Sequence, residues 1–497
     1  MVKSYISAKC LCRFRLSTAT ESLNISTTLP NLLPKFYFCN KFKKKMIVFQ
    51  GGRDLPDVAE RCNGGHFLAA DSASSSYSSS GEPAKGPAPP ARPWRLWLVA
   101  LALLLALGAG LGLPLALGGP GRRDTPQARL DTVRRLLRDS PLVDGHNDLA
   151  WNVRKFMHNK IGGLNLSADL ARVEPWAKSQ WSHTDIPRLR AGLVGAQFWS
   201  AYVPCGAQHA DAVQLTLEQI DVIKRLIDLN PRHLSLVTGS RELLDTHRAG
   251  RIASLIGVEG GHSLGNSLGV LRSLYGLGAR YLTVTHTCDT PWAGAAGGDK
   301  GLTPFGRTVI REMNRLGMLV DLSHVAATTA RDALNASHAP VVFSHSGAMA
   351  LCNSTRNVPD DILKLVARNG GVVMVNFFSQ LVTCNDTATI KDVIRHINHI
   401  RAVAGVDHVG IGAGYDGINM TPTGLEDVSR YPHLLAELLA DPAWSERDVL
   451  KLAGLNVVRA LGRVEEVRDK WRLAAVLPAE EPPPAPAEPS SCSYPLS

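Results

Sequence analysis

Between about residue 125 and residue 465, short apolar runs alternate with helix-like stretches, and this alternation limits the possible folds most strongly. Several runs are apolar throughout, which is typical of parallel strands buried on both faces. Helical patterns lie between them, as at 212–228, 306–317 and 388–404. The eight runs read PLVDGHND, VGAQFWSAYV, RIASLIGVEG, RYLTVTHT, MLVDLSH, PVVFSH, GGVVMVNFF and HVGIGAGYDG.

Eight strands that alternate with helices predict an α/β fold, a (β/α)8 barrel of the TIM type. A doubly wound open sheet is the alternative. No G-x-G-x-x-G motif follows any of the runs, which counts against a dinucleotide-binding version of that alternative.

The positive charge of the chain is concentrated near its beginning. The net charge is +10, but residues 1–53 hold ten Lys and Arg residues and one acidic residue, Glu21. The rest of the chain is close to neutral. The composition therefore does not imply a basic face on the folded part, and we expect no nucleic-acid partner.

A long uncharged run indicates a membrane segment. It begins LWLVALALLLALGAG, and we assign residues 95–119 to a transmembrane helix. A buried core helix is the disfavoured alternative, because the run is apolar on all sides. Arginines flank both ends, so charge does not settle the orientation; we expect residues 1–94, with a Ser/Pro/Gly-rich linker at 71–93, to be disordered and cytoplasmic.

These boundaries predict an extracellular catalytic domain at the cell surface over residues 120–470. A Pro-rich disordered tail follows at 471–497. A second methionine, Met46, leaves open whether residues 1–45 belong to the natural product.

The folded part has an even number of cysteines and no C-x-x-C pair, which suits two disulfides in an oxidising compartment. Glycosylation sequons agree with that compartment. The cysteines are Cys205, Cys288, Cys352 and Cys384. Four such sequons begin at Asn165, Asn335, Asn353 and Asn385.

Several predicted strands end in residues that bind metals. In a barrel all strands present their carboxyl ends on one face, so residues far apart in the sequence converge there. Any one of these histidines alone is more often a hydrogen-bonded core residue than a ligand. Four of them with two carboxylates at equivalent positions predict a metal centre. They are His146, Asp148, Glu259, His286, His324 and His345.

The number of candidate ligands exceeds what one tetrahedral zinc ion needs and suits two ions that share a carboxylate. We assign His146, Asp148 and Glu259 to one ion, and Glu259, His324 and His345 to the other. His286 remains for the substrate. Two divalent ions lower the pKa of a bridging water, so that a hydroxide attacks a carbonyl that the ions polarise. A nucleophilic Cys288–His286 pair is disfavoured, because a disulfide is expected at Cys288.

The chain resembles the membrane dipeptidase (renal dipeptidase) family of the amidohydrolase superfamily from roughly Ser140 to Val467. The motifs that carry this resemblance are LVDGHNDL, LVGAQFWSAYVPC, LIGVEGGHSL, YLTVTHTCDTPWA, RLGMLVDLSH, PVVFSHS, RNVPDDIL and GLEDVSRYP. The resemblance implies a binuclear zinc hydrolase that cleaves dipeptides with a free C-terminal carboxylate. Some family members also cleave cysteinyl-glycine, leukotriene D4 or β-lactams.

The resemblance also implies roles for single residues. It gives the same five zinc ligands, makes Glu259 and His286 catalytic, and places His286 against the substrate. Arg356 is implied to bind the substrate carboxylate, where a planar guanidinium contacts both oxygens. Disulfides Cys205–Cys288 and Cys352–Cys384 are implied too. Family members are commonly homodimers, and Cys492 is a candidate link between two chains.

The last predicted strand departs from the family pattern. The family has G-D-F/Y-D-G there, and this chain has Ala413-Gly414-Tyr415-Asp416-Gly417. Loss of a general acid–base group typically lowers a rate about a hundred- to ten-thousand-fold. Asp416 either substitutes in part, as a substrate-binding group, or serves the turn structurally. Leu381 stands where an aromatic residue is expected in the substrate pocket.

Two functions from different classes follow. The first is a membrane-bound zinc dipeptidase, slowed by Gly414. The alternative is a catalytically weak or inactive cell-surface receptor or adhesion protein on the same scaffold. A different amidohydrolase reaction, such as opening of a cyclic amide, is a third possibility.

Overall fold

The structure is a computed structural model that describes residue 94 and residues 97–106, 125–480 and 482. Residues 97–106 are helical, and the other positions of the predicted 95–119 membrane segment lie outside the described residues. The expected disordered region 1–94 lies almost wholly outside them, and so does Cys492. Of the tail expected at 471–497, residues 471–480 and 482 are described: a helix continues to Leu473, and the backbone of Ala479 hydrogen-bonds to Arg272 and Glu312, so the folded part extends beyond the predicted boundary. Within the described part, no helix has both the length and the apolar character needed to span a membrane.

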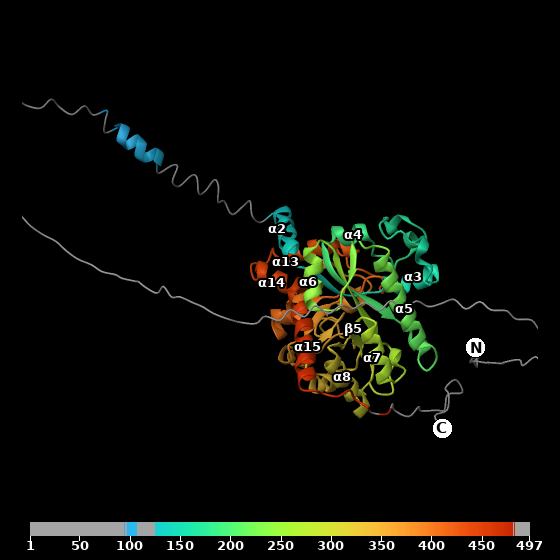
Figure 1. The fold of residues 1–497 in the computed structure, drawn as a ribbon. Helices are drawn as coiled ribbons and strands as arrows, with labels where there is room; N and C mark the ends of the chain where they lie inside the picture. Colours follow the sequence, from blue (N-terminus) through green and yellow to red (C-terminus); the bar gives the residue numbers. More distant parts are fainter. Residues whose placement is uncertain (1–93, 95–96, 107–124, 481, 483–497) are drawn as a thin grey trace, which may run out of the picture. The chain divides into compact units, whose positions relative to one another are not determined.

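Eight parallel strands form a closed barrel (Figure 1). Around the ring the order is β1, β2, β4, β5, β6, β7, β8 and β9, and β9 pairs again with β1. Pairing of β2 with β4 closes the ring. The strands are β1 Leu142–Asn147, β2 Val194–Tyr202, β3 Leu234–Leu236, β4 Ile252–Glu259, β5 Ala279–Thr283, β6 Leu319–Asp321, β7 Val341–Phe343, β8 Val372–Val375 and β9 Val409–Ile411.

The predicted (β/α)8 barrel is confirmed, and each of the eight predicted runs coincides with one strand of the ring, although β5 begins one residue before its run, at Ala279. The sequence pattern did not indicate β3, which pairs with β4 and lies outside the ring. This strand has only three residues and is partly exposed. It therefore lacks the buried apolar run by which the other strands were recognised.

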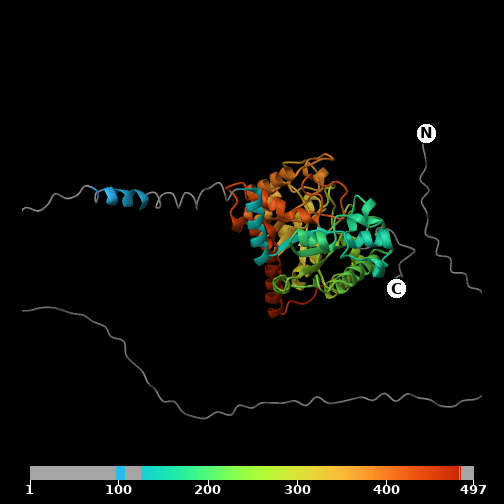
Figure 2. The same cartoon turned by 90° about the horizontal axis from the view of Figure 1, so that it is seen from above.

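Helices follow the strands and cover the outside of the barrel (Figures 1 and 2). The helix predicted at 212–228 is found at those bounds as α5, and the other two differ by two residues or fewer at either end. The helices are α2 Pro126–Asp139, α3 Leu149–Met157, α4 Ile186–Ala191, α5 Ala212–Asp228, α6 Ser240–Arg248, α7 Leu268–Gly276, α8 Pro304–Leu316, α9 Ala327–Ala336, α10 Asp360–Asn369, α11 Ser379–Val382, α12 Ile390–Ala404, α13 Tyr431–Leu438, α14 Glu446–Leu450 and α15 Asn456–Leu473.

Loops on the barrel are joined by two disulfides. Cys205, after β2, is bonded to Cys288, after β5, at a sulfur–sulfur distance of 2.09 Å. Cys352 is bonded to Cys384 at 2.00 Å. Both pairings are those that the family resemblance implies.

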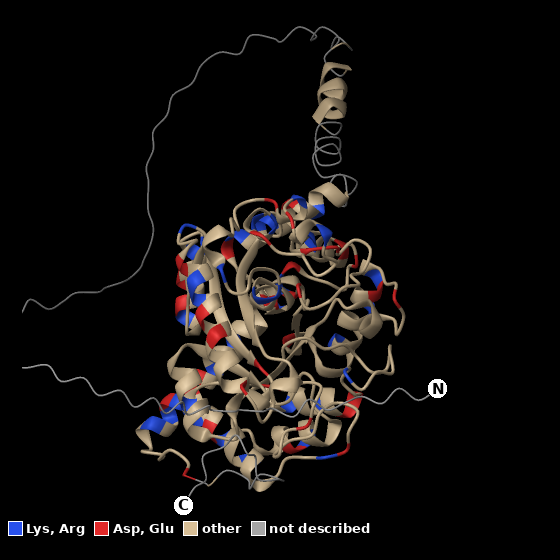
Figure 3. Ribbon diagram, turned by 90° about the vertical axis from the view of Figure 1, so that its right-hand side faces the viewer, with Lys and Arg blue, Asp and Glu red and all other residues tan. Residues whose placement is uncertain are grey.

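On the face shown in Figure 3, Lys and Arg lie interspersed with Asp and Glu along the outer helices.

The barrel interior is packed around Tyr281 of β5. Its side chain is fully buried and stacks on Phe198 of β2, with 5.1 Å between the ring centroids. Gly257 of β4 leaves the space that this ring occupies, because a Cβ atom on Gly257 would lie 1.9 Å from the Tyr281 Cζ atom. A small residue on β4 is therefore required for the aromatic ring on β5.

We predict that Gly257→Ala lowers the free energy of unfolding by about 1–3 kcal/mol, the usual effect of overpacking a dense core. Gly276→Ala is the matched control, because Gly276 is exposed at the end of α7 and a Cβ there meets nothing within 4 Å. The control is expected to be neutral or stabilising by up to about 1 kcal/mol. Urea denaturation of both variants measures the difference, and equal stability would contradict this account of the packing.

Candidate metal centre

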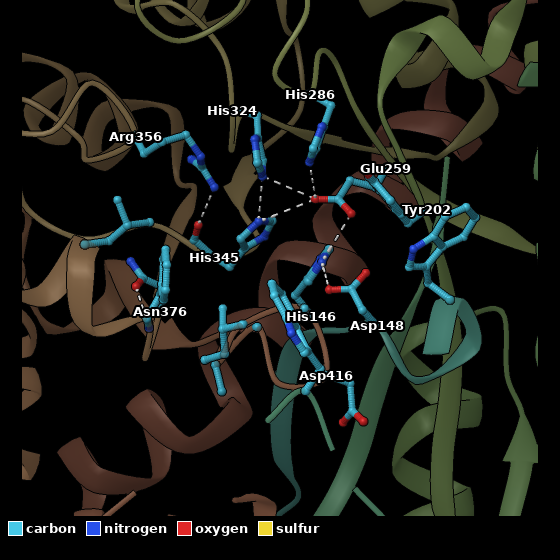
Figure 4. A pocket seen from close by; sticks show the side chains of 18 of the residues that line it. His146, Asp148, Tyr202, Glu259, His286, His324, His345, Arg356, Asn376 and Asp416 are labelled. Atoms are coloured by element: carbon cyan, nitrogen blue, oxygen red, sulfur yellow. Dashed lines mark hydrogen bonds and ion pairs between the residues drawn. The ribbon is translucent and has the colours of Figure 1, made fainter. Parts of the chain in front are cut away.

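The six predicted site residues come together at the carboxyl end of the barrel (Figure 4). His146 belongs to β1, and Asp148 is the first residue after that strand. Glu259 is the last residue of β4. The other three lie in the loops just beyond β5, β6 and β7, at His286, His324 and His345.

The carboxylate of Glu259 lies at the centre of this cluster. Its Oε2 atom is 3.5 Å from His146 Nε2, and its Oε1 atom is 3.3 Å from His324 Nε2. Oε1 is also 3.6 Å from His345 Nε2 and 3.8 Å from His286 Nε2. The two oxygens of a single carboxylate therefore face different histidines.

Within this cluster, two groups of three residues have spacing suitable for a metal ion. Their ligand atoms lie within 4.8 Å of one another in His146–Glu259–His345 and in Glu259–His286–His324. This division differs from the one expected from the sequence, where His345 is grouped with His324 and His286 is left for the substrate. The Nε2 atoms of His324 and His345 are only 3.0 Å apart, so His345 borders both groups. A third group of the described residues, Cys205–His262–Cys288, has its two sulfurs joined in a disulfide.

Hydrogen bonds from outside the cluster orient two of the histidines. The Nδ1 atom of His146 is 3.0 Å from the hydroxyl of Tyr281. The Nδ1 atom of His345 is 2.8 Å from the hydroxyl of Ser344, which itself donates to Asp321. Partners of this kind fix the ring and the tautomer of a metal-binding histidine, which leaves Nε2 toward the ion.

The backbone at His324 is held in an unusual conformation. Its φ is 68°, in the left-handed region that non-glycine residues seldom adopt. Its carbonyl accepts hydrogen bonds from the Thr285 hydroxyl at 2.9 Å and the Ala296 amide at 2.8 Å. Such conformations persist where the surroundings enforce them, and they occur often at functional sites.

Burial determines the charge of the cluster. It lowers the pKa of His286 to about 4, and it lowers the pKa values of His324 and His345 well below the usual value. Burial alone would raise the pKa of Glu259, but the nearby imidazoles, above all His146, hold it well below its ordinary value. Neutral imidazoles at His286, His324 and His345 around an ionised carboxylate are protonation states that bind metal ions. At His146 burial lowers the pKa, but the neighbouring groups Tyr281, Glu259 and Asp148 outweigh it and raise the pKa well above its ordinary value, so a metal ion would displace a proton there.

A cavity of about 450 Å³ opens onto the cluster. Arg356 lies on one side of the histidines, and Asp148 and Tyr202 lie on the other (Figure 4). Arg356 Nη2 is 3.5 Å from the carbonyl of His345, and Nη1 has no hydrogen-bond partner among the described residues. Burial lowers the pKa of Arg356 to about 10, so this side chain remains charged at neutral pH.

Several residues that line the cavity were not predicted from the sequence. Asn376 follows β8 directly, so its position at a strand end marks it in the same way as the predicted site residues. Trp151 and Lys155 lie four residues apart on α3, and Trp181 comes from the loop before α4. These three follow no strand of the barrel, and no local pattern marks them as pocket residues. Leu381 lines the cavity, as expected for its position.

Gly414 and Asp416 lie in the cavity wall beyond β9. The Oδ2 atom of Asp416 accepts a hydrogen bond from the Thr184 hydroxyl, and Oδ1 is 3.4 Å from the His183 amide nitrogen. Asn152 donates to the Asp416 carbonyl oxygen at 2.9 Å. Burial raises the pKa of Asp416 to about 7. The carboxyl group is therefore hydrogen-bonded to the loop before α4, which carries His183 and Thr184.

A closed parallel barrel with imidazoles and carboxylates at its carboxyl rim defines a metal-dependent barrel enzyme as the class. Residues 130–475 match the sequence profile described as "Membrane dipeptidase (Peptidase family M19)". The chain belongs to this family.

Two curated relatives are similar to the chain. Dipeptidase 3 of Mus musculus is 48% identical over 343 residues, which cover 67% of this chain and 66% of the mouse protein. Dipeptidase 3 of Rattus norvegicus is also 48% identical over 343 residues, which cover 67% of each chain. The chain thus matches slightly less than two thirds of the mouse protein.

Solved structures share the fold. The dipeptidase AC, a metallo peptidase of family M19, has a TM-score of 0.58 at 26% identity, and the match covers 66% of this chain and 99% of that one. A metallo peptidase from Rhodobacter sphaeroides, liganded with a phosphinate mimic of the dipeptide L-Ala-D-Ala, has a TM-score of 0.57 at 26% identity. That match also covers 66% of this chain and 99% of the other.

We predict that Tyr281→Phe weakens divalent-metal binding about 10- to 100-fold, because His146 loses the partner that orients its ring. Tyr415→Phe is the control. It removes an equally buried hydroxyl, whose hydrogen bond goes to the Leu425 carbonyl. Competition with a metal chelator measures both affinities. Equal affinities in the two variants would contradict an orienting role for Tyr281.

Proposed function

We propose that the protein is a zinc-dependent dipeptidase with two ions per chain. Its substrates are dipeptides and similar amides that carry a free carboxylate. The observation that carries the proposal is the position of Glu259, whose two oxygens face different histidines within one buried cluster. A carboxylate placed in this way is suited to bridge two ions.

The donor atoms fit zinc. Imidazole nitrogens and carboxylate oxygens are its usual ligands besides thiolates. In addition, the Oδ1 atom of Asp148 is buried with no hydrogen-bond partner among the described residues. An unpaired buried carboxylate oxygen is costly unless a cation binds it. The proposed ligands are His146, Asp148, Glu259, His324 and His345.

Bound zinc would polarise the scissile carbonyl and lower the pKa of a water. The protein's own side chains would bind and orient the substrate around that chemistry. Arg356 would hold the substrate carboxylate through its free Nη1 group. His286, neutral because its pKa is about 4, would contact the substrate as a hydrogen-bonding imidazole.

The proton transfers that hydrolysis requires have the least support from the side chains of this site. Gly414 has no side chain to carry a proton to the leaving nitrogen, and the oxygens of Asp416 accept hydrogen bonds from Thr184 and the His183 amide. Absence of a general acid–base group lowers a rate about 10²- to 10⁴-fold. The proposed activity is therefore slow but dependent on zinc.

The substrates proposed first are cysteinyl-glycine and leukotriene D4, which the family resemblance implies. The names of the relatives and the dipeptide mimic held by the Rhodobacter sphaeroides enzyme support the dipeptide class. We also propose a homodimer, with Cys492 as a candidate link between chains.

We predict that the full chain binds two zinc ions and slowly releases glycine from cysteinyl-glycine. Glu259→Gln is expected to bind fewer ions and to lose this activity, because the bridging charge is removed. Glu437→Gln, an exposed position on α13, is the matched control and retains both properties. Elemental analysis gives the stoichiometry and a glycine assay gives the rate. A single ion per chain would contradict the binuclear site.

The second candidate is a cell-surface receptor or adhesion protein without catalytic activity. Gly414 is the observation that favours it. The same experiment separates the two candidates, because a folded protein with two zinc ions and no turnover on any dipeptide or similar amide with a free carboxylate would be the scaffold. Turnover in Gly414→Asp but not in the unchanged protein would then identify the glycine as the cause.

We also propose that residues 95–119 anchor the domain in the plasma membrane, with the domain outside the cell. The two disulfides support an oxidising compartment. The four sequon asparagines named above are exposed on the domain, so glycans would meet no steric barrier there: Asn165, Asn335, Asn353 and Asn385. A fifth sequon of the domain begins at Asn419, which is half-buried.

We predict that the protein expressed in mammalian cells carries N-glycans and resists extraction by alkaline carbonate. Treatment with a glycosidase is expected to increase its mobility on a gel. Replacing the asparagines of all five sequons of the domain with glutamine, Asn419 included, serves as the control and should abolish that shift. An unglycosylated product in which the sequons are intact would place the domain on the cytoplasmic side.

A further inference from the structure

In the part of the chain that the structure describes, the cavity has a site for a negative group but none for a positive one. Under the proposed function Arg356 takes the carboxylate of the substrate. A dipeptide also carries an ammonium group at its other end, and a buried ammonium needs an anionic or otherwise electron-rich partner.

Three carboxylates line the cavity, and all of them have other partners. Asp148 and Glu259 are proposed zinc ligands, and two divalent ions carry more positive charge than two carboxylates neutralise. Asp416 is the third. Its oxygens accept hydrogen bonds from Thr184 and from the amide of His183. None of the three is free to pair with an ammonium group.

Aromatic faces could bind an ammonium group, but the protein's own cations lie over two of them. The Nζ atom of Lys155 is 5.1 Å from the centroid of the Trp181 ring. The guanidinium carbon of Arg154 is 5.9 Å from the Trp151 ring centroid. Lys155 also adds positive charge at the cavity, which disfavours a second cation beside it.

At Gly414 the loop after β9 contributes no charged side chain to the cavity, although there is space for one. A Cβ atom on Gly414 would meet only Ile418 Cγ2, at 3.8 Å, so the wall has space for a side chain. The nearby cavity residues Ile418, Leu381 and Phe378 are apolar. This part of the cavity therefore suits an uncharged, apolar group better than an ammonium group.

We propose that this site selects N-acyl amino acids, in which the amino end is an uncharged acyl chain, over free dipeptides. The inference rests on the proposed function and narrows its substrate class. The reaction adds a water oxygen to the acyl carbon and breaks the carbon–nitrogen bond. A proton passes to the nitrogen, which gives a fatty or short-chain carboxylate and a free amino acid.

Propionyl-glycine and L-alanyl-glycine test the inference, because they differ only in the amino group and both release glycine. We predict that the zinc-loaded protein has a kcat/KM about tenfold to a hundredfold higher for propionyl-glycine, since the ammonium group would be buried without a partner. Gly414→Asp is expected to remove or reverse this preference. Asp tolerates the left-handed backbone at this position, where φ is 77°.

Gly414→Asn is the matched control, with the same shape and no charge, and it should keep the preference for propionyl-glycine. Lys155→Glu provides a second test on an exposed position of α3, where folding is not at risk. It is expected to shift the ratio toward alanyl-glycine by several-fold. An unchanged ratio in both Gly414→Asp and Lys155→Glu would overturn the inference.

The outcomes also separate this inference from the function on which it rests. Preferred hydrolysis of alanyl-glycine by the unchanged protein would overturn the inference and leave the dipeptidase function intact. If neither compound is cleaved, calorimetric binding to the zinc-loaded protein decides. Tighter binding of propionyl-glycine would support the selectivity, whereas tighter binding of alanyl-glycine, or binding of neither, would overturn it.

Discussion

The contact of one buried carboxylate with four imidazoles is the interaction on which the functional end of this protein depends. Glu259 is 3% exposed, and its oxygens lie within 3.8 Å of nitrogens from four separate segments of the chain. A charged group buried to this extent is strongly destabilising unless its surroundings compensate for it. The closed barrel makes this compensation possible, because it brings the ends of β1, β4, β5, β6 and β7 to one rim.

Two further buried carboxylates hold the ends of strands around this centre. Asp144 of β1 accepts hydrogen bonds from Gln197, from Tyr431 and from the amide of Ala413. Asp321 at the end of β6 accepts from the hydroxyls of Thr283 and Ser344, and it also accepts from the amides of the loops that carry His324 and His345. Each of these carboxylates thus joins neighbouring segments, so the ligand positions depend on a polar network beneath the rim.

The barrel and the cluster could be predicted because both follow from one local pattern. Apolar runs of strand length mark the strands, and the first polar residues after them mark the rim. The pattern failed where structure is short or where side chains approach from elsewhere. The three-residue β3 has no such run, and Tyr281 reads as an ordinary core residue although its hydroxyl contacts His146. The contact between Lys155 and Trp181 joins a helix to a loop, and sequence spacing does not encode it.

The metal ligands and the substrate-facing wall come from different parts of the fold, which allows one to change without the other. The proposed ligands lie on or just after β1, β4, β6 and β7, whereas Gly414 belongs to the loop after β9, and Lys155 and Trp181 lie on α3 and the loop before α4. Gly414 contacts the cluster only through its backbone, whose amide donates to the carbonyl of His146 at 3.2 Å. A residue without a side chain keeps that bond. The glycine can therefore change the charge and size of the cavity wall while every candidate ligand keeps its position, so a complete ligand set is compatible with an altered substrate.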